Sequence, residues 1–375
     1  MAEGKVNCDA CFLFRGDVRY DSRLRNVLHT LRKVGQSCHV IQGALDDSAF
    51  ECEGASVGSF QNRRRGPLGF FDYWRKSSRH TGAVNARIWW AAELYSLPLA
   101  VREARKRNSK VVYDAREIFA HLAALRNRPL SQGFWRYLER RYIAHADAVI
   151  TSGDMDAEFL AARFGIDPPH VALNVPRFRE VARTHRLHEL LGLKPDIPIC
   201  LYIGGLQEGR GIGFTIKLAA ELPEAAFVFV GDGPLAADLR KAQKQTSNVY
   251  HLPAVPNDQV IDLAASATVG LALIEPISFS YQLALPNKLF EYITAGTPVV
   301  VTNLPQMHKI VEEHHVGIAV SPDDFAGALS AIRRLLSDSA LHAECAASCC
   351  KAARTLSWEA QEQGLLGYLR AREII

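Results

Sequence analysis

Lys288 and Glu291 stand in a segment whose apolar spacing predicts a helix over Pro286–Ala295, with Pro286 suited to the first turn. Lys288 falls within that turn, where the helix dipole and the cationic side chain both attract an anion. Glu291 follows three residues later on the same helix face. The pair could bind a phosphate and a sugar diol together, or it could be a surface ion pair that contributes little.

Two glycine-rich segments follow predicted strands in the same half of the chain. The first is Gly204-Gly205-Leu-Gln-Glu-Gly-Arg210-Gly211, and the second is Gly231-Asp-Gly-Pro234. Glycines allow the backbone to approach a ligand closely, and a helix that follows offers free N–H groups to an anion. Arg210 would add a forked, permanently charged donor for phosphate. Each segment taken singly is also explained by a structural turn.

The elements that must position these residues alternate between short apolar runs and helical stretches. In the N-terminal half we expect strands at Ala10–Phe14, Cys38–Gln42, Ile88–Trp90, Lys110–Tyr113 and Ala148–Thr151, and helices at Arg23–Lys33, Leu97–Arg107 and Phe134–Ala146. In the C-terminal half we expect strands at Ile199–Ile203, Ala226–Val230, Val249–Leu252, Val269–Ile274, Pro298–Val301 and Gly317–Val320. Helices are expected there at Ile212–Glu221, Leu235–Gln245, Val260–Ala267, Pro286–Ala295, Met307–Glu313 and Trp358–Arg370.

Buried strands separated by helices predict parallel sheets with right-handed crossovers. The fold class is therefore α/β, with two doubly wound, Rossmann-like domains. We expect these domains at 1–188 and 189–355, with a C-terminal helix over 356–375 that crosses back to the first. In such folds ligands lie at the carboxyl ends of the strands, so we expect the site in a cleft between the domains.

The charge is divided unevenly along the chain. Residues 1–186 hold 30 Lys and Arg against 20 Asp and Glu, whereas residues 187–375 hold 14 against 20. A basic half favours an anionic partner, either a phosphorylated ligand, a membrane surface or a nucleic acid. The basic and aromatic segment Arg63–Lys76 could hold an anionic acceptor, rest on a membrane surface or form a solvated loop. Nothing else in the chain matches a nucleic-acid module, so no nucleic-acid partner is expected.

Composition indicates a globular protein of a reducing compartment. The chain has 375 residues, 48% of them hydrophobic, without a run of about 18 apolar residues or a recognisable signal peptide. Its eight cysteines include one pair at metal or redox spacing, Cys8-x-x-Cys11, which falls in a predicted strand without a second pair. We therefore expect buried thiols, no metal site, and a cytoplasmic protein that could lie peripherally at the inner membrane face.

The segment Pro286-Asn-Lys-Leu-Phe-Glu-Tyr-Ile-Thr-Ala-Gly-Thr-Pro-Val-Val300 resembles the signature of family 4 glycosyltransferases, retaining enzymes of the GT-B fold. The glycine-rich loop that ends in Arg210-Gly211 is similar to that family's donor-diphosphate loop, and Gly231-Asp-Gly-Pro234 matches a family turn. In the first half, the segments 112–119, 146–152 and 174–176 resemble family positions that line the cleft. The likeness covers nearly the whole chain and is looser before Asp114.

The resemblance implies that a nucleotide-sugar donor, a UDP- or GDP-sugar, is held mainly by the second domain, without a further cofactor. Arg210 and Lys288 would bind the diphosphate and Glu291 the ribose hydroxyls. The remaining donor residues implied by the resemblance are Gly204, Gly205, Gly211, Gly231, Ala254, Val255, Asn287 and Leu289. The backbone near Ala254 would lie close to the base, and the N–H groups of Asn287 and Leu289 would border the phosphates.

On the acceptor side, the resemblance implies the first domain, with the loop 15–21 and the stretch 116–121. The residues expected on the acceptor side are Arg15, Gly16, Asp17, Glu117 and His121. The basic charge of that domain suggests an anionic acceptor. The catalytic residues expected are Arg210, Lys288 and Arg116.

Two positions depart from the family pattern. Leu283 stands where a first glutamate of an E-x7-E pair is common, and Arg116 stands where a histidine is common beside the transferring sugar. Contacts of the first glutamate could pass to Ser280, Tyr281 or the backbone. Arginine cannot act as a base near neutral pH, so the expected role of Arg116 is electrostatic or structural.

The resulting hypothesis is metal-independent sugar transfer with retention of anomeric configuration, because no carboxylate pair for double displacement and no Asp-x-Asp at a strand end are evident. Two alternatives stay open, a sugar-nucleotide 2-epimerase of the same fold and a non-catalytic nucleotide-sugar-binding subunit. An NAD-dependent oxidoreductase is disfavoured because Arg15-Gly-Asp-Val, rather than G-x-G-x-x-G, follows the first strand.

Overall fold

The protein is described here by a computed structural model that covers residues 5–45, 50–64 and 66–375. The chain divides into two compact units, Met1–Asn174 with Gln361–Ile375, and Val175–Ala360. These boundaries differ from those expected at 188 and 355. The segment that follows Asn174 belongs to the second unit because Arg179 pairs with Asp262 at 2.8 Å and the Thr184 N–H donates to the Ala265 carbonyl.

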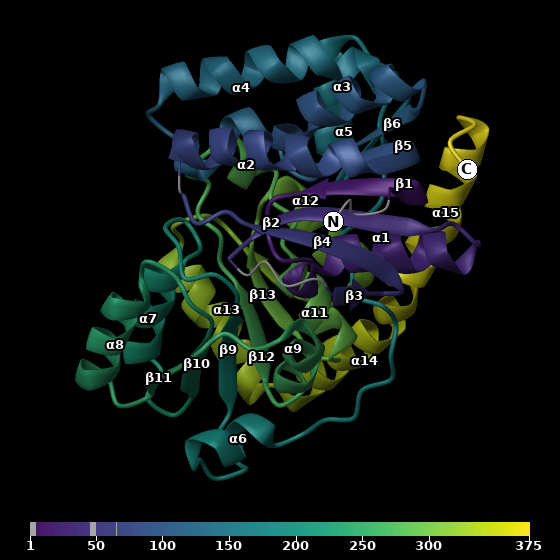
Figure 1. Ribbon diagram of the computed structural model, residues 1–375. Helices are drawn as coiled ribbons and strands as arrows, with labels where there is room; N and C mark the ends of the chain where they lie inside the picture. Colours follow the sequence, from purple (N-terminus) through teal and green to yellow (C-terminus); the bar gives the residue numbers. More distant parts are fainter. Residues whose placement is uncertain (1–4, 46–49, 65) are drawn as a thin grey trace. The chain divides into compact units, whose positions relative to one another are not determined.

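The first unit is built on an eight-stranded sheet in the order β3-β4-β2-β1-β5-β6-β7-β8, with helices on both faces (Figure 1). All neighbouring strands are parallel except β3 and β4. Its elements are β1 (Val6–Phe14), α1 (Ser22–Lys33), β2 (Cys38–Ala44), β3 (Phe50–Cys52), β4 (Ala55–Gln61), α2 (Gly66–His80), β5 (Val84–Ala92), α3 (Leu97–Arg107), β6 (Lys110–Ala115), α4 (Pro129–Tyr142), β7 (Ala148–Thr151), α5 (Asp154–Phe164) and β8 (His170–Val171).

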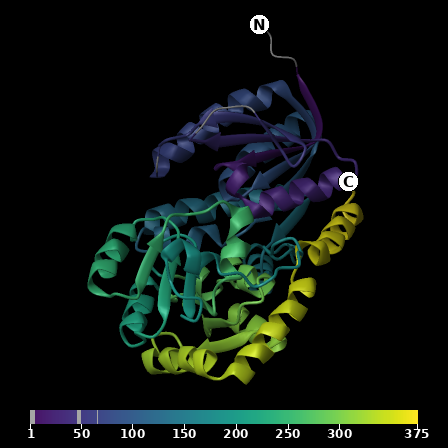
Figure 2. The same cartoon turned by 90° about the horizontal axis from the view of Figure 1, so that it is seen from below.

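The last helix, α15 (Trp358–Ala371), begins in the second unit and continues in the first. Within the first unit it runs close to α1, where Lys33 pairs with Glu362 at 2.8 Å (Figures 1 and 2). The Tyr368 hydroxyl donates to the Val149 carbonyl of β7. These contacts fix the C-terminus of the chain to the unit in which the chain starts.

The second unit is a six-stranded parallel sheet in the order β11-β10-β9-β12-β13-β14. Its strands β9 (Ile199–Ile203) and β10 (Ala226–Val230) are buried along their whole length, as expected for parallel strands covered on both faces. The other elements are α6 (Arg186–Leu191), α7 (Ile212–Ala220), α8 (Ala236–Gln245), β11 (Val249–Leu252), α9 (Asn257–Ala264), β12 (Val269–Ala272), α10 (Phe279–Gln282), α11 (Asn287–Thr294), β13 (Val299–Thr302), α12 (Pro305–His314), β14 (Gly317–Val320), α13 (Phe325–Ser337) and α14 (Ser339–Thr355).

In each sheet, the side on which successive strands are added reverses once. The chain builds outward from β1 through β2 and then returns to place β5 on the other side of β1, and β12 lies beside β9 in the same way. Such switch points leave a crevice at the carboxyl ends of the two strands, where ligands bind in α/β folds. The α/β fold class and the doubly wound layout predicted from the sequence are therefore confirmed.

The segment Arg63–Lys76 is not a solvated loop, because α2 begins at Gly66. Its Tyr73 and Gly69 are buried, while Leu68 and Phe71 are exposed. Proline at the second position of a helix is tolerated, since the N–H that it lacks has no intrahelical partner there.

Across the described residues, we find no helix of the length and apolarity needed to span a bilayer.

The turns after β9 and β10 are pressed together, and Gly231 makes this possible. Gly231 has φ +150°, and a Cβ built on it would lie 2.0 Å from the Gly204 carbonyl oxygen. The Gly204 N–H donates to the Val230 carbonyl at 2.9 Å. A side chain at Gly231 would therefore push apart the two turns that border the switch point.

We predict that Gly231→Ala lowers the free energy of unfolding by at least about 2 kcal/mol, because the new methyl group meets backbone rather than a movable side chain. The matched control is Gly213→Ala in α7, where no atom lies within 4 Å of the added Cβ. That control should be stabilised by about 0.5–1 kcal/mol through helix propensity. Urea denaturation of both variants measures the difference, and equal stabilities would contradict the close packing of the turns.

Candidate functional site

The helix α11 is fixed over the β9/β12 switch point by Tyr292. The Tyr292 hydroxyl donates to the Leu201 carbonyl at 2.9 Å and accepts from the Ile203 N–H at 3.0 Å. Its ring lies over Gly270 of β12, where a Cβ would come within 2.4 Å of the ring. The first turn of α11, which carries Lys288, is thereby held at the carboxyl end of β9.

Lys288 is buried, with only 6% of its surface exposed, and its Nζ has no hydrogen-bond partner among the described residues. The ammonium lies 3.4 Å from the centroid of the Tyr202 ring and 3.4 Å from the position of a Cβ on Gly204. Burial and then the nearby Arg210 lower the pKa of Lys288 well below its ordinary value, against the opposing effect of Glu291. The alternative of a surface ion pair is therefore wrong.

Arg210 lies next to this ammonium and is half-buried. Its guanidinium carbon is 4.5 Å from the centroid of the Tyr281 ring, a cation–π arrangement that orients the side chain. No ion pair joins Arg210 or Lys288 to a carboxylate in the described parts of the chain. Two cations without an anionic partner thus lie close to one helix N-terminus.

Glu291 is half-buried one turn along α11 from Lys288. Burial raises the pKa of Glu291 to about 7, and the Lys288 ammonium partly offsets that effect. Its carboxyl group therefore titrates near neutral pH, where it can accept hydrogen bonds from hydroxyl groups when ionised.

The loop after β9 turns into α7 at Gly211, which is packed as tightly as Gly231. Gly211 has φ +75°, and a Cβ there would lie 2.0 Å from the Leu273 carbonyl oxygen. Gly205 is exposed, and its carbonyl accepts from the Tyr202 hydroxyl at 2.7 Å. The predicted glycines Gly204, Gly205, Gly211 and Gly231 thus all border the switch point of one sheet.

The other predicted donor residues differ in their exposure and in the hydrogen bonds of their backbone N–H groups. Asn287 is exposed at the start of α11. The Leu289 N–H donates to the Pro286 carbonyl at 3.1 Å in the ligand-free chain, and its place beside a phosphate stays a prediction. Ala254 is exposed after β11, with its N–H bonded to the Asp232 carboxylate at 3.1 Å, and Val255 is half-buried beside it.

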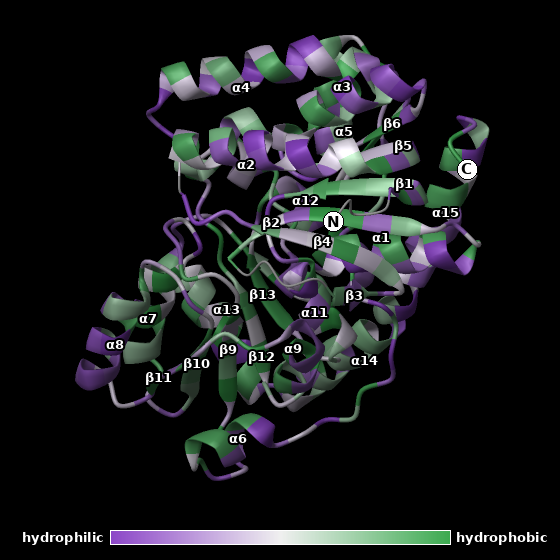
Figure 3. Ribbon diagram, in the orientation of Figure 1, coloured by the Kyte–Doolittle hydropathy of each residue, from purple (hydrophilic) through white to green (hydrophobic). Residues whose placement is uncertain are grey.

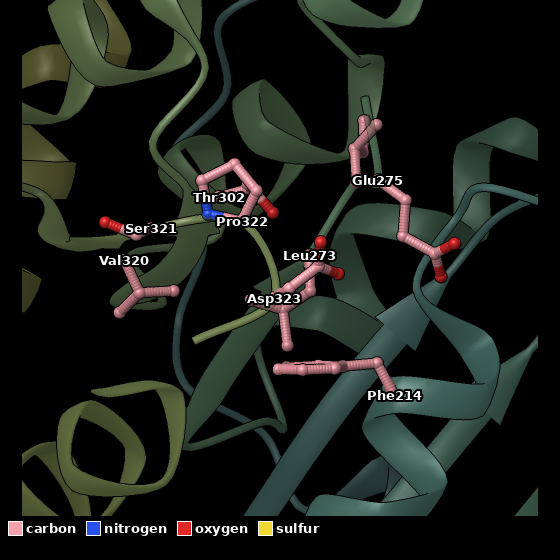
Figure 4. A pocket seen from close by; sticks show the side chains of 9 residues that line it. Phe214, Leu273, Glu275, Thr302, Val320, Ser321, Pro322 and Asp323 are labelled. Carbon is pink, nitrogen blue, oxygen red and sulfur yellow. The ribbon is translucent and has the colours of Figure 1, made fainter. Parts of the chain in front are cut away.

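A small hollow, open to solvent, lies at the carboxyl ends of β12, β13 and β14 (Figure 4). Phe214 of α7 forms one side, and Glu275 and Asp323 bring carboxylates to it. Burial and then Asp323 raise the pKa of Glu275, which accepts from the Gly211 N–H. Sequence inspection did not identify this hollow, because its residues come from three strand ends with no shared motif.

In the first unit, Arg116 is part of a buried chain of alternating charges. Arg116 donates to Asp21 at 2.6 Å and to Asp114 at 3.2 Å, and Arg23 donates to Asp114 at 2.8 Å from its other side. Although burial disfavours a charged group, Asp21 and Asp114 raise the pKa of Arg116 above its ordinary value. Arg116 is therefore held as a cation, which agrees with the expected electrostatic or structural role.

One donor in this network has no acceptor: the Arg116 Nη2 is buried and forms no hydrogen bond among the described residues. The Ser152 hydroxyl donates to the Arg116 carbonyl at 2.7 Å and fixes the backbone there. The free Nη2 at the carboxyl end of β6 can therefore donate to an added group without breaking the existing ion pairs.

Glu93 is a residue that sequence inspection missed. It follows β5 at the β1/β5 switch point and has φ +86° and ψ 159°, a conformation that is normal only for glycine. Its Oε2 is buried and has no partner in the described chain. Burial raises the pKa of Glu93 well above its ordinary value, with Arg116 acting in the opposite direction. No local sequence signal marks a strained glutamate.

The loop after β1 carries Arg15, Gly16 and Asp17. The Arg15 N–H donates to the Tyr95 hydroxyl at 3.2 Å, and its guanidinium donates to Asn62 at 3.3 Å. A Cβ on Gly16 would lie 2.7 Å from the Phe14 ring. Asp17 accepts from the N–H and the side chain of Arg19, so it is committed to a local turn.

Glu117 and His121 follow Arg116 along the chain. Glu117 is exposed, and His121 packs edge-on against Phe159 with 5.9 Å between ring centroids. Burial and then Arg136 and Arg163 lower the pKa of His121. The structure therefore brings Arg15, Gly16 and Arg116 to the carboxyl edge of the first sheet with Glu93, and it places His121 against α5.

Over the described residues, no cluster of three or more His, Cys, Asp or Glu side chains has the geometry to hold a metal ion. Cys11 is buried and Cys8 is half-buried within β1.

Two family models match the chain. "Glycosyl transferase 4-like domain" matches residues 21–177, and "Glycosyl transferases group 1" matches residues 197–338. Among curated proteins, the chain is 28% identical to a D-inositol 3-phosphate glycosyltransferase of Acidothermus cellulolyticus, over 66% of this chain and 60% of that protein. It is 26% identical to an alpha-D-kanosaminyltransferase of Streptomyces kanamyceticus, over 69% of this chain and 66% of that protein. These matches span less than two thirds of either relative.

Solved structures with the same fold include the sucrose-phosphate synthase of Thermosynechococcus elongatus, with a TM-score of 0.77 at 15% identity over 97% of this chain and 98% of that one. The Anabaena protein HepE in complex with UDP-glucose gives a TM-score of 0.74 at 15% identity, over 96% of this chain and 99% of that one. At this identity the likeness establishes the fold alone.

We predict that Lys288→Met raises the free energy of unfolding of the ligand-free protein by about 1–3 kcal/mol, because it removes an unpartnered buried charge. The native state releases the Lys288 proton below the ordinary pKa of 10.5, so wild-type stability rises with pH toward that value. The gain in the variant should therefore shrink as the pH rises toward 10.5, as measured by urea denaturation. Lys241→Met, at an exposed position in α8, is the control, and a destabilised Lys288→Met protein would contradict the assignment.

We predict that Glu93→Gly raises the free energy of unfolding by about 1–3 kcal/mol, because glycine adopts the observed backbone conformation without strain. Glu93→Gln keeps the side-chain volume and the Cβ, so any gain it shows reports replacement of the buried carboxyl group alone. Thermal unfolding of both variants separates the two contributions. A Glu93→Gly protein no more stable than Glu93→Gln would show that the backbone at this position is unstrained.

Proposed function

We propose that this chain, which belongs to the family 4 glycosyltransferases of the GT-B fold, transfers a sugar from a nucleoside diphosphate-sugar to a hydroxyl group of an acceptor. The family membership supplies the reaction class, and the site in the second unit supports the type of donor. Relatives named as glycosyltransferases favour transfer over the alternatives of an epimerase or a binding subunit.

The observation that carries the proposal is the buried, unpartnered ammonium of Lys288 beside Arg210. Two cations with no carboxylate partner are unfavourable in the empty site, and a diphosphate would compensate both. The N-terminus of α11 adds its positive dipole to the same place. A neutral ligand would leave this charge uncompensated, so the site favours a polyanion.

The ribose hydroxyls of the donor would be bound by Glu291, which stands one turn from Lys288 and offers carboxylate oxygens as acceptors to a diol. The exposed backbone near Ala254 would meet the base, and the turn at Gly204 and Gly205 would lie along the phosphates. The HepE structures contain UDP and UDP-glucose, which makes UDP-sugars the first donors to test, ahead of GDP-sugars.

We propose retention through attack on the same face of the sugar. The bond between the anomeric carbon and the diphosphate oxygen breaks, and the acceptor oxygen forms its bond on the face that the diphosphate leaves. The acceptor proton passes to an oxygen of the departing phosphate, so no side-chain base is required. This scheme fits Arg116, whose guanidinium is held as a cation by Asp21 and Asp114.

Charge that develops on the leaving diphosphate would be stabilised by Arg210, Lys288 and the α11 dipole, all of which are in place before the reaction. We propose that these groups serve in place of a divalent cation. Full rates in the presence of EDTA would support that proposal, and loss of activity that Mg²⁺ restores would overturn it.

We propose that the acceptor binds to the first unit, at the carboxyl ends of β1, β5 and β6. The unpartnered Arg116 Nη2 can donate to an acceptor oxygen, and Glu93 can bind an acceptor hydroxyl. The charge excess of residues 1–186, with 30 basic against 20 acidic side chains, supports an anionic acceptor.

We predict that Arg210→Ala and Lys288→Ala each lower kcat/KM for the best donor by about 100-fold or more, because each removes a cation that stabilises the leaving group. The measurement is release of nucleoside diphosphate from a panel of UDP- and GDP-sugars, with Arg240→Ala of α8 as an exposed control. Near-normal rates in both variants would contradict the assignment. An epimerised sugar without an acceptor would identify an isomerase, and donor binding without turnover on any acceptor would identify a binding subunit.

A further inference from the structure

The helices α2 and α4 carry most of the large apolar side chains that the first unit exposes. Of the eight exposed large hydrophobic residues in the described chain, five lie on these two helices: Leu68, Phe71, Leu130, Phe134 and Tyr137. Leu130 is 89% exposed. Clusters of this kind mark an interaction surface, whereas single exposed apolar residues do not.

Each helix presents these side chains as a stripe that is separate from the face it buries. On α2, Leu68, Phe71, Arg75 and Arg79 follow one another at helical spacing, and all are exposed. The buried side chains of α2, which include Tyr73 and Ser77, lie on a different face. The helix therefore has one apolar face for the core and a second, mixed apolar and basic stripe that is exposed.

The same arrangement recurs on α4. Leu130, Phe134, Tyr137 and Arg141 form its exposed stripe, while Trp135 and Glu139 are buried. The two helices are neighbours, because the Trp74 and Phe134 rings lie 6.4 Å apart and the Phe70 and Trp135 rings 4.7 Å apart. Figure 3 shows hydrophilic and hydrophobic bands alternating along both helices.

The exposed charge on these helices has one sign. Their two acidic side chains, Asp72 and Glu139, are both buried, the first paired with Lys76 at 3.0 Å and the second bonded to the Tyr113 hydroxyl at 2.8 Å. The exposed charged residues described on the two helices and in their flanking segments are all arginines, namely Arg63, Arg64, Arg75, Arg79, Arg126, Arg128, Arg136, Arg140 and Arg141. A partner that matches this surface is therefore anionic as well as apolar.

We propose that the exposed stripes of α2 and α4 form a docking face for an anionic lipid bilayer. Interfacial helices combine leucine and aromatic side chains that enter the acyl boundary with arginines that meet lipid headgroups. Leu68 and Leu130 favour a bilayer over a nucleic acid, because aliphatic chains do not provide the flat stacking surface that bases require.

The position of the docking face within the first unit suits an acceptor delivered from a membrane. The Arg15 side chain donates to the Arg64 carbonyl at 3.1 Å and lies 4.7 Å from the Phe70 ring centroid, so the start of α2 adjoins the loop after β1. That loop is part of the proposed acceptor side. Binding to the bilayer itself does not depend on the proposed transferase activity and is tested without it.

The experiment is flotation of the full-length chain with vesicles of phosphatidylcholine alone, and with vesicles in which about one quarter of the lipid is phosphatidylglycerol. We predict binding to the anionic vesicles that weakens as ionic strength rises. Arg79→Gln with Arg141→Gln should lower that binding about 30-fold, since each basic side chain near an anionic surface contributes about fivefold. Leu130→Ser with Phe134→Ser should lower it about tenfold or more.

The matched controls are Arg240→Gln on α8 and Leu190→Ser on α6, which remove an exposed charge and an exposed leucine from the second unit. Unfolding temperatures of all variants establish that they remain folded. The proposal is overturned if the full-length chain fails to float with anionic vesicles, or if the control variants lose as much binding as the paired variants. Binding of a single-stranded oligonucleotide, lost in the paired variants while vesicles are not bound, would assign the face to nucleic acid instead.

Discussion

An ammonium without a partner, buried at the end of a parallel sheet, is the constraint around which the second unit is organised. Tyr292 ties α11 to β9 through its hydroxyl, and the turn at Gly204 lies against the Lys288 side chain. A buried charge of this kind is unfavourable in the empty protein and becomes favourable once an anion is bound. The burial of Lys288 is therefore a cost to stability that the proposed diphosphate would offset.

In the first unit, the buried charges are paired instead. Arg23, Asp114, Arg116 and Asp21 alternate in sign, and each is joined to the next by hydrogen bonds. Two exceptions lie at the sheet edge, where the Arg116 Nη2 and the Glu93 Oε2 are both unpartnered in the described chain. A rigid, paired network thus supports two unsatisfied groups, and the backbone strain at Glu93 lies where the acceptor is proposed to bind.

The structure shows where the charged side chains of the two units lie. The second unit is the less basic part, yet it holds the two unpaired cations, because local placement of Arg210 and Lys288 matters more there than net charge. In the first unit, five exposed arginines lie on α2 and α4 and four more lie in the segments that flank them. Part of the basic excess of that half therefore belongs to one surface.

The sequence alone determined the order of most strands and helices, the tight turns and the position of Lys288 in a first helical turn. These features depend on periodicity, glycine and proline, all of which act over a few residues. It did not reveal α2 as a helix, because Gly66, Pro67 and Gly69 at its start are typical of a loop. Only the tertiary structure decided that Lys288 is buried, that Glu93 is strained and that Arg116 is held by partners. The Arg23–Asp114 and Asp21–Arg116 contacts join residues 91 and 95 positions apart, and burial and pairing at such separations follow from how the strands are ordered in the sheet.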